Sequence, residues 1–298
     1  MAGMNRRTFL ASTAAAASLS SLGAAESPWD GPVLDIHLHP RSGEATETQH
    51  LQGAGCTNAV LLPGRSAEEH CQEVMRREPG RYLRFANADP KSVDAIEHLR
   101  AAVKDGAAGF GELKYPVALD APDVLRFYEL AADLNVPVLI HFQENLSFTG
   151  FERLPSVVQR YPRTRFIGHA NSWWAYISSA GDNKSGYPDG RIQPGGLTDR
   201  LLSDYPNIYG DLSANSGRNA LARDPEFAAA FLERHKSKLM FGSDCGCRDG
   251  HGTGQPQGGA LAGKCVAQET LALLKKLAPP PLFRQIVYGN GARFYKLA

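Results

Sequence analysis

Residues 33–39 read VLDIHLH, a short apolar segment that ends in two histidines separated by one residue. In an extended strand successive side chains point to opposite faces, so His37 and His39 project from the same face. Branched apolar residues fill the rest of the segment, as in buried strands. We therefore predict a strand over Val33–His37 that presents a pair of imidazoles at its carboxyl end.

Similar apolar segments recur along the chain, separated by longer amphipathic stretches. This alternation is typical of parallel strands joined by helices. The predicted strands are Val33–His37, Asn58–Leu62, Tyr82–Ala86, Gly109–Lys114, Val136–Phe142, Arg165–His169, Asn207–Leu212 and Lys238–Asp244. The predicted helices are Ala67–Arg77, Ser92–Lys104, Asp123–Leu134, Leu154–Arg160, Pro225–Lys236 and Lys264–Leu277, with Ser66 and Ser92 as N-terminal caps.

Eight strand–helix units predict an α/β fold of the (β/α)₈ type, a TIM barrel. Such a barrel occupies about 250 residues, which suits a single domain over residues 26–298. An open dinucleotide-binding sheet is disfavoured because no GxGxxG motif follows the first strand. The longest loop-like insert, Gly181–Gly196, follows the sixth strand, where it can cover a site at the barrel mouth.

The first 25 residues differ in composition from the rest of the chain. Arg6 and Arg7 are followed by Thr-Phe-Leu, an Ala/Ser/Leu segment and the small residues Gly23-Ala24-Ala25. A charged start, a short apolar segment and a small-residue cleavage site are typical of an export signal. The paired arginines resemble a twin-arginine signal. We predict that residues 1–25 are removed on export to the periplasm or another extracytoplasmic space.

Charge gives little reason to expect a polyanionic partner. The 32 Lys and Arg residues nearly balance the 31 Asp and Glu residues of the 298-residue chain. No whole-protein field therefore favours nucleic acid or an anionic membrane. We expect a small-molecule substrate, no nucleic acid partner and no stable membrane association after removal of the signal. A homo-oligomer is left open.

The cysteine pattern indicates no disulfide framework. The chain has five cysteines, an odd number, and none stands in a CxxC pair. Cys245 and Cys247 follow a candidate catalytic aspartate. At the level of sequence, small buried loop residues are the favoured interpretation of these two, over a cysteine metal site.

Further histidines and an aspartate stand where predicted strands end. His141, His169 and Asp244 each follow an apolar segment, as His37 and His39 do. The carboxyl ends of barrel strands converge on one mouth, where barrel enzymes place their active sites. A single histidine in such a place is usually a packing residue. Four histidines and one aspartate at strand ends together predict a divalent metal site. Imidazole and carboxylate ligands favour Zn²⁺, with one or two ions.

These motifs resemble the amidohydrolase superfamily, in particular the amidohydrolase-related branch that includes aminocarboxymuconate-semialdehyde-decarboxylase-like proteins. The resemblance covers nearly all of residues 26–298 and lies in DIHLH at 35–39, IH at 140–141, GH at 168–169, GDLSA at 210–214, FGSD at 241–244 and YGNGARFY at 288–295. It implies that His37, His39, His141 and Asp244 are metal ligands. His169 would ligate a second ion or contact substrate, and Asp244 would also take a proton from the metal-bound water.

The fourth predicted strand leaves the number of ions open. Two-metal relatives carry a carboxylated lysine or a glutamate there, and single-metal relatives carry neither. Glu112 and Lys114 are two residues apart, so both can face inward. They could form an ion pair, but a carboxylate among histidines suits a second ion. We therefore expect Glu112 to be a ligand or bridge and hold Lys114 as a substrate-binding candidate.

Other polar and aromatic residues are candidates for substrate contacts or ligand support. Asn171, Trp173 and Trp174 follow His169 directly, which would place them on the rim of the mouth. Exposed aromatic rings at a mouth often stack on substrate, although tryptophan is as often a packing residue. Asp211, at the end of the seventh strand, could orient a ligand histidine or a substrate group.

The favoured function is hydrolysis of an amide, ester or lactone of a small molecule by metal-activated water. Non-oxidative decarboxylation of an aromatic or unsaturated acid is the alternative, because the resembled branch contains both chemistries. A TatD-type phosphodiesterase would also use an HxH pair and a glutamate on the fourth strand. Its substrates favour a basic groove, which the near-neutral charge disfavours. A barrel that binds metal without catalysis is the remaining alternative.

Overall fold

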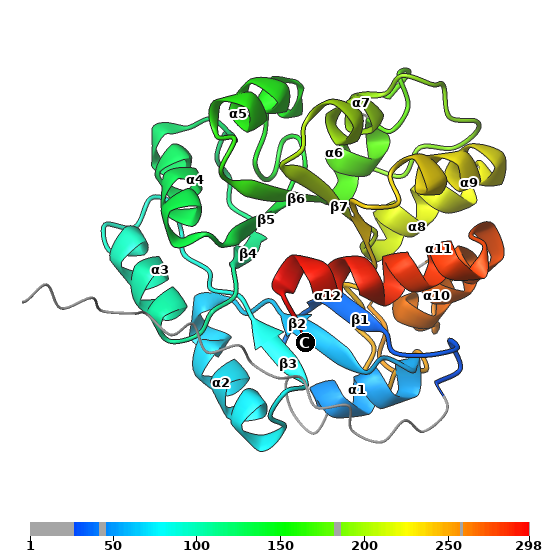
Figure 1. Cartoon of the computed structure of the whole chain (residues 1–298), viewed down its shortest axis with the longest axis horizontal. Coiled ribbons are helices and arrows are strands. Elements are labelled where there is room, and N and C mark those ends of the chain that lie inside the picture. The colour runs from blue at the N-terminus through cyan, green and yellow to red at the C-terminus, as the bar shows by residue number, and fades with distance from the viewer. Residues whose placement is uncertain (1–26, 42–45, 182–185, 257–258, 298) are drawn as a thin grey trace, which may run out of the picture.

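Eight short parallel strands form a ring with the helices arranged around it (Figure 1). The computed structural model describes residues 27–41, 46–181, 186–256 and 259–297, so the predicted signal at residues 1–25 lies outside the described residues. The strands are β1 (Leu34–Leu38), β2 (Asn58–Leu61), β3 (Tyr82–Arg84), β4 (Phe110–Leu113), β5 (Pro137–His141), β6 (Arg165–His169), β7 (Ile208–Asp211) and β8 (Leu239–Met240). Each lies within a predicted strand or extends it by one residue.

The strands pair in two parallel sheets, in the order β1-β2-β3 and β4-β5-β6-β7-β8. Backbone hydrogen bonds cross both gaps between these sheets. Between β3 and β4, the N–H of Gly111 donates to the carbonyl of Ala86 at 2.8 Å. Between β8 and β1, the N–H of Ile36 donates to the carbonyl of Phe241 at 3.1 Å. The two sheets thus form the predicted (β/α)₈ barrel.

The six predicted helices are all present, and further helices accompany them. The helices are α1 (Glu47–Ala54), α2 (Glu68–Arg77), α3 (Ala95–Lys104), α4 (Pro122–Leu134), α5 (Leu154–Arg160), α6 (Ala170–Ala175), α7 (Leu197–Asp204), α8 (Ala214–Ala222), α9 (Pro225–Arg234), α10 (Val266–Leu277), α11 (Pro280–Arg284) and α12 (Asn290–Tyr295). Within the described residues, no helix is both long and apolar enough to cross a bilayer.

Two details of the helix predictions are wrong. Ser66 and Ser92 cap no helix, because α2 begins after Ala67 and α3 after Asp94, both without a side-chain cap. The predictions also did not include α1, α6, α7, α8, α11 and α12. For α1 the reason is visible in its buried face. That face includes the polar side chains of Glu47 and His50 next to apolar ones, so no apolar stripe marks the helix.

The core has an inner and an outer layer. Outside the strands, apolar side chains pack against the surrounding helices. Inside the ring lie Leu34, Ile36, Val60, Leu62, Phe85, Leu139, Ile167 and Met240, packed with Phe294 of α12. In Figure 1, α12 crosses the centre of the ring. Phe294 lies against Arg165, the first residue of β6, and Tyr209, the second residue of β7, so α12 covers the amino ends of these strands and the mouth lies at the carboxyl ends.

Candidate metal centre

The candidate ligands reach one place from six strands. His37 and His39 lie at the end of β1, and the others lie in or directly after the later strands: Glu112 in β4, His141 at the end of β5, His169 at the end of β6, Asp211 at the end of β7 and Asp244 after β8. The topology explains the convergence, because the carboxyl ends of all barrel strands surround one mouth.

Nitrogen and oxygen atoms crowd together at the centre of this group. His39 Nε2 lies 3.4 Å from His37 Nε2, 3.3 Å from Glu112 Oε2 and 3.3 Å from Asp244 Oδ1. Nε2 of His169 is buried and has no hydrogen-bond partner among the described residues. Lone pairs this close repel one another unless a cation or a proton lies between them. The residues present therefore fit a divalent metal ion.

The outward ring nitrogens are held by other groups. His37 Nδ1 lies 2.7 Å from Asp211 Oδ2, and His39 Nδ1 lies 2.9 Å from the carbonyl oxygen of Leu62. His169 Nδ1 lies 2.8 Å from the hydroxyl of Ser213. A ring that donates its Nδ1–H in this way keeps a lone pair on Nε2, the atom that faces the centre. These contacts orient three imidazoles for metal binding.

Glu112 lies between two sets of possible ligands. Its Oε1 is 2.6 Å from His141 Nδ1 and 3.3 Å from His169 Nε2, while its Oε2 faces His39. Glu112 thus belongs both to a donor set with His37 and His39 and to one with His141 and His169. A carboxylate shared by two donor sets is the arrangement that could bridge two ions.

The electrostatics of the centre favour positive charge. Burial would lower the pKa of His39, but hydrogen bonds and charges of Asp244 and Glu112 hold this pKa well above its usual value. Burial would raise the pKa of Glu112, yet the close contacts of its carboxylate with the imidazoles of His141, His169 and His39 hold it well below the usual range. For Asp244, burial is likewise outweighed by the neighbouring imidazoles, which lower its pKa to about 2. Both carboxylates are therefore ionised near neutral pH.

Comparison with known proteins identifies the family. A family model described as amidohydrolase matches residues 44–297, which is most of the chain. The chain belongs to the amidohydrolase family. It is accordingly a metal-dependent enzyme, and the donor groups described above are its candidate metal-binding residues. No curated protein matches the chain significantly.

Solved structures share the amidohydrolase fold at low sequence identity. A protein described as a 2-pyrone-4,6-dicarboxylic acid hydrolase from Acinetobacter baumannii has a TM-score of 0.60 at 15% identity, over 90% of this chain and 100% of its own. Dihydroorotase from Campylobacter jejuni has a TM-score of 0.58 at 16% identity, over 89% and 83%. A dihydroxybenzoic acid decarboxylase from Polaromonas, with bound manganese, has a TM-score of 0.53 at 15% identity, over 89% and 97%.

Lys114 lies outside the amidohydrolase centre, contrary to expectation. Glu112 is buried, whereas Lys114 is exposed and forms no ion pair with Glu112 among the described residues. The expected alternation fails because β4 ends at Leu113 and its register against β5 shifts between Phe110 and Leu113. Neither an inward Lys114 nor an ion pair between the two residues is found.

The aromatic rim is also corrected. Trp173 and Trp174 are 0% and 1% exposed, and Trp173 packs against Phe142 and Phe151. The short helix α6 starts directly after His169 and turns both rings into the outer core, so neither is placed to stack on substrate. Asn171 is only partly buried, and its side chain donates to the carbonyl of Gly186 at 3.0 Å. It thereby ties α6 to the insert after β6.

Sequence reasoning did not single out two residues that support the centre. Ser213 contacts both His169 and Asp211, with its hydroxyl 2.8 Å from Asp211 Oδ2. Gln143 Oε1 lies 3.0 Å from His141 Nε2. Ser213 stands two residues after Asp211 and Gln143 two after His141, so same-face spacing at strand ends was an available signal.

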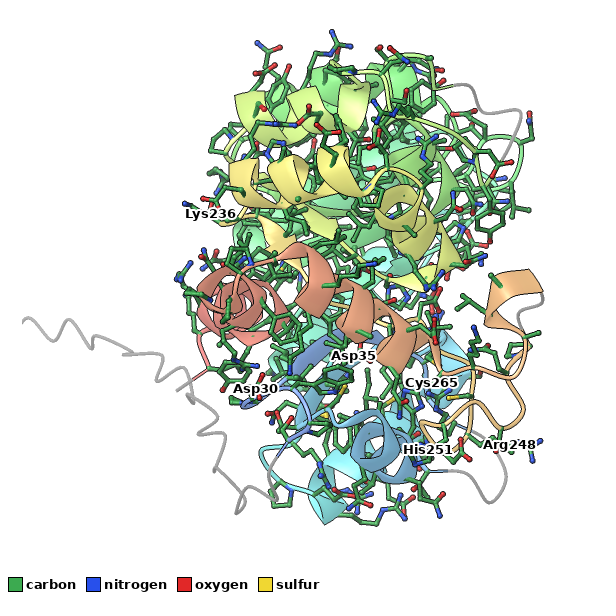
Figure 2. The ribbon with its side chains drawn as sticks, turned by 90° about the vertical axis from the view of Figure 1, so that its right-hand side faces the viewer. Asp30, Asp35, Lys236, Arg248, His251 and Cys265 are labelled. Atoms are coloured by element: carbon green, nitrogen blue, oxygen red, sulfur yellow. The ribbon has the colours of Figure 1, made fainter. Side chains whose placement is uncertain are left out.

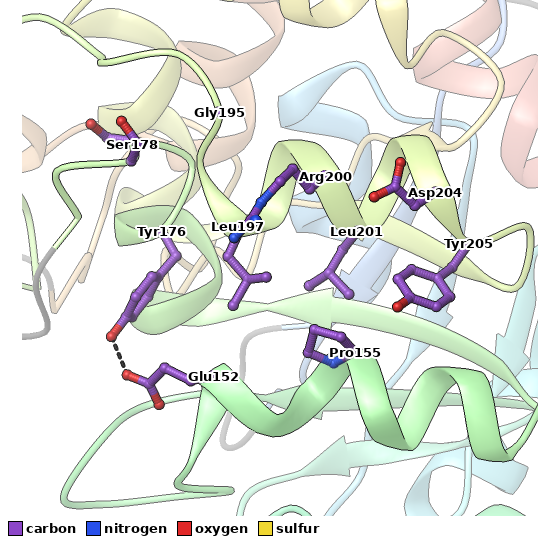
Figure 3. Close-up of a pocket in the computed structure, with 11 residues that line it drawn as sticks. Glu152, Pro155, Tyr176, Ser178, Gly195, Leu197, Arg200, Leu201, Asp204 and Tyr205 are labelled. Carbon is purple, nitrogen blue, oxygen red and sulfur yellow. Dashed lines mark hydrogen bonds between the residues drawn. The ribbon is translucent and has the colours of Figure 1, made fainter.

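A cavity of about 460 Å³ lies apart from the metal centre, between α5, α6 and α7. Figure 3 shows its lining, with Tyr176 hydrogen-bonded to Glu152 on one side and Arg200 and Tyr205 on another. None of the candidate metal ligands lines it. The candidate active site is therefore defined by the donor groups at the barrel mouth and not by this cavity.

Proposed function

We propose that this amidohydrolase cleaves an amide, ester or lactone bond of a small molecule by attack of water. The observation that carries the proposal is the position of Asp244. Its carboxylate is ionised, lies 3.3 Å from His39 Nε2 and is 24% exposed, whereas Glu112 is 6% exposed. A proton acceptor that touches both the centre and the mouth is what hydrolysis by water requires.

The metal ligands of the proposal are His37 and His39, with Asp244 and Glu112. Glu112, with His141 and His169, would hold a second ion; a single ion would leave His169 free to contact substrate. A divalent ion there supplies Lewis-acid chemistry, lowering the pKa of water and polarising the substrate carbonyl. We propose Zn²⁺, because imidazole and carboxylate ligands suit it; Mn²⁺ is the competing ion.

Asp244 is held rigidly for its proposed task. Its backbone has a φ of 48°, in the left-handed region that aspartate tolerates better than most residues. Its N–H donates to the carbonyl of His37 at 2.8 Å, which locks the β8 loop onto β1. In the proposed reaction, the Asp244 carboxylate accepts a proton from the attacking water and returns it to the leaving group.

Decarboxylation is the competing reaction for the same residues. It requires delivery of a proton to carbon after CO₂ leaves. The Asp244 carboxylate is ionised and partly exposed to the mouth, so it is in the form that can accept a proton from water. The ionised state of Asp244 and its exposure at the mouth therefore favour hydrolysis over decarboxylation.

The test is a substrate panel with two readouts. Purified protein lacking residues 1–25 is loaded with Zn²⁺ or Mn²⁺ and offered lactones, amides, esters and aromatic carboxylic acids. Hydrolysis predicts one oxygen from ¹⁸O-labelled water in the acid product and no CO₂. The matched control is Asp244→Asn with equal metal content. Stoichiometric CO₂ without labelled oxygen in the product would overturn the hydrolase proposal.

We also propose export by the twin-arginine route. The support is the arginine pair at residues 6 and 7, followed by an apolar segment and small residues. A signal-dependent reporter fused to residues 1–30 should reach the periplasm, and Arg6→Lys/Arg7→Lys should abolish this. Export that persists in the double variant would contradict the twin-arginine assignment.

A further inference from the structure

Three cysteines and a histidine meet in a second cluster beside the metal centre. This Cys₃His cluster consists of His50 from α1, Cys245 and Cys247 from the loop after β8, and Cys265 at the start of α10. All four residues are buried. None belongs to the donor sets at the barrel mouth. In Figure 2, Cys265 lies on the same side of the view as Arg248 and His251. Asp30, which precedes β1, and Lys236, which precedes β8, lie on the opposite side.

The spacing of the four ligand atoms suits a tetrahedral zinc ion. Cys245 Sγ lies 3.3 Å from Cys247 Sγ and 3.8 Å from Cys265 Sγ, and His50 Nδ1 lies 3.5 Å from Cys247 Sγ. All four atoms lie within 4.8 Å of one another. Zn–S bonds of ~2.3 Å and a Zn–N bond of ~2.0 Å in a tetrahedron place sulfurs ~3.8 Å apart and sulfur ~3.5 Å from nitrogen.

Groups around the cluster suit the negative charge of thiolates. The backbone N–H of Val266 points at Cys245 Sγ at 3.3 Å, and the side-chain amide of Gln255 at 3.4 Å. Arg41 lies close enough for its charge to act on His50, and two of its buried guanidinium nitrogens have no hydrogen-bond partner among the described residues. Three thiolates and Zn²⁺ carry a net charge of minus one, which this guanidinium can balance.

The imidazole is also in the form that a metal needs. Burial, aided by the charge of Arg41, lowers the pKa of His50 to about 4, so the ring is neutral near neutral pH. Its Nε2 has no hydrogen-bond partner among the described residues. No contact from the described part of the chain therefore requires a lone pair on Nε2. The ring can carry its proton on Nε2 and keep its lone pair on Nδ1, the atom that faces Cys247.

We propose that His50, Cys245, Cys247 and Cys265 bind a structural Zn²⁺ ion. Four protein ligands leave no position for water or substrate, as in structural zinc sites. The ion would join α1 and α10 to the loop after β8, which carries Asp244 directly before Cys245. Its role is thus to hold Asp244 in place, while the ion itself takes no part in the reaction. The geometry of the four ligands does not depend on which reaction takes place at the barrel mouth.

The decisive measurement is zinc content in matched variants of the full mature chain. Cys265→Ala removes one proposed ligand, and Cys71→Ala removes an equally buried cysteine of α2 outside the cluster. After loading with Zn²⁺ and removal of loosely bound ion, Cys265→Ala should hold about one zinc fewer per chain. Cys71→Ala should match the unmodified protein. Equal zinc in both variants overturns the proposal.

The absorption spectrum of bound Co²⁺ shows whether the ligands are sulfur atoms, without any substitution in the Cys₃His cluster. Co²⁺ bound to the unmodified chain should give an intense sulfur-to-cobalt charge-transfer band, and this band should persist in His39→Ala, which disables only the barrel-mouth centre. A cobalt-loaded chain without that band overturns the zinc site even if Cys265→Ala fails to fold. A disulfide among the three cysteines would also overturn the zinc site. Mass spectrometry of alkylated peptides, from protein purified without reductant, tests for such a disulfide.

Discussion

Asp211 Oδ2 lies 2.7 Å from the Nδ1 of His37, and both side chains are completely buried. The carboxylate also accepts a hydrogen bond from Ser213, so it is fixed from two sides. It lies behind the metal centre, and its contact with His37 decides which ring nitrogen keeps a lone pair for the ion. We therefore expect Asp211 to act through His37 as a positioning residue.

Asp211→Asn should weaken metal binding without removing it. The amide keeps an oxygen that can accept from His37 but loses the negative charge that favours the required tautomer. We expect metal affinity to fall about 10- to 100-fold, with the fold retained. Competition with a metal-sensitive dye measures the affinity, and circular dichroism checks the fold. Unchanged affinity would show that the packing of His37 alone sets its orientation.

Glu112→Gln should change the number of ions per chain. If Glu112 bridges two ions, the amide should lower the stoichiometry at the barrel mouth from two to about one, because one bridging oxygen is lost. Elemental analysis of protein in the Cys265→Ala background isolates this count from the Cys₃His cluster. Lys114→Gln is the control and should leave the count unchanged, since Lys114 is exposed. A count of one in the unmodified centre would show that Glu112 serves a single ion.

Asp244→Asn should reduce turnover far more than it reduces metal content. An amide cannot accept the proton, so kcat should fall by roughly two to four orders of magnitude. Because the pKa of Asp244 is about 2, an acidic limb of the rate profile near neutral pH belongs to other groups and should keep its midpoint in this variant. Activity that simply tracks residual metal across several preparations would count against the proton-transfer role.

Metal binding at the barrel mouth should release protons and strengthen with rising pH. In the metal-free centre the pKa of His39 is held well above 6.5, so its imidazole carries a proton that the ion must displace. Affinity should therefore rise with pH until the pH passes that raised value. In the metal-free protein, the proton on His39 stabilises the fold at low pH, and this contribution is lost as the pH rises through the raised pKa.

Zinc titrations by calorimetry, in buffers of different ionisation enthalpy, count the released protons. In His39→Ala the count should fall and the pH dependence should flatten. An affinity that is the same at about pH 6 and about pH 8 would rule out this competition.

Trp173→Leu should lower stability and leave substrate affinity unchanged. The ring is 0% exposed and packs among Phe142, Phe151 and Trp174, so a smaller side chain leaves a cavity. We expect a loss of about 2–4 kcal/mol in the free energy of unfolding, by analogy with other large-to-small core changes. Chemical denaturation measures the loss. A raised KM with unchanged stability would instead indicate that Trp173 contacts substrate at the barrel mouth.

The barrel and much of its metal centre were predictable because they depend on local pattern. An apolar strand, its direction and the residue at its end are properties of short segments, and parallel topology brings strand ends together regardless of the loops between them. His37, His39, Glu112, His141, His169 and Asp244 could therefore be expected to lie together, and the structure places them at one mouth.

Only the tertiary structure decided where the remaining side chains point. Lys114 follows a register shift and the end of β4, so alternation no longer applied to it. The Trp173 ring packs in the outer core, between the strands and the surrounding helices, because α6 begins directly after His169. His50 and Cys265 are separated by more than two hundred residues and share no motif, so no local pattern could place them beside Cys245 and Cys247. That contact depends on how α1, α10 and the β8 loop pack, because packing, unlike strand pattern, joins residues that are distant in the chain.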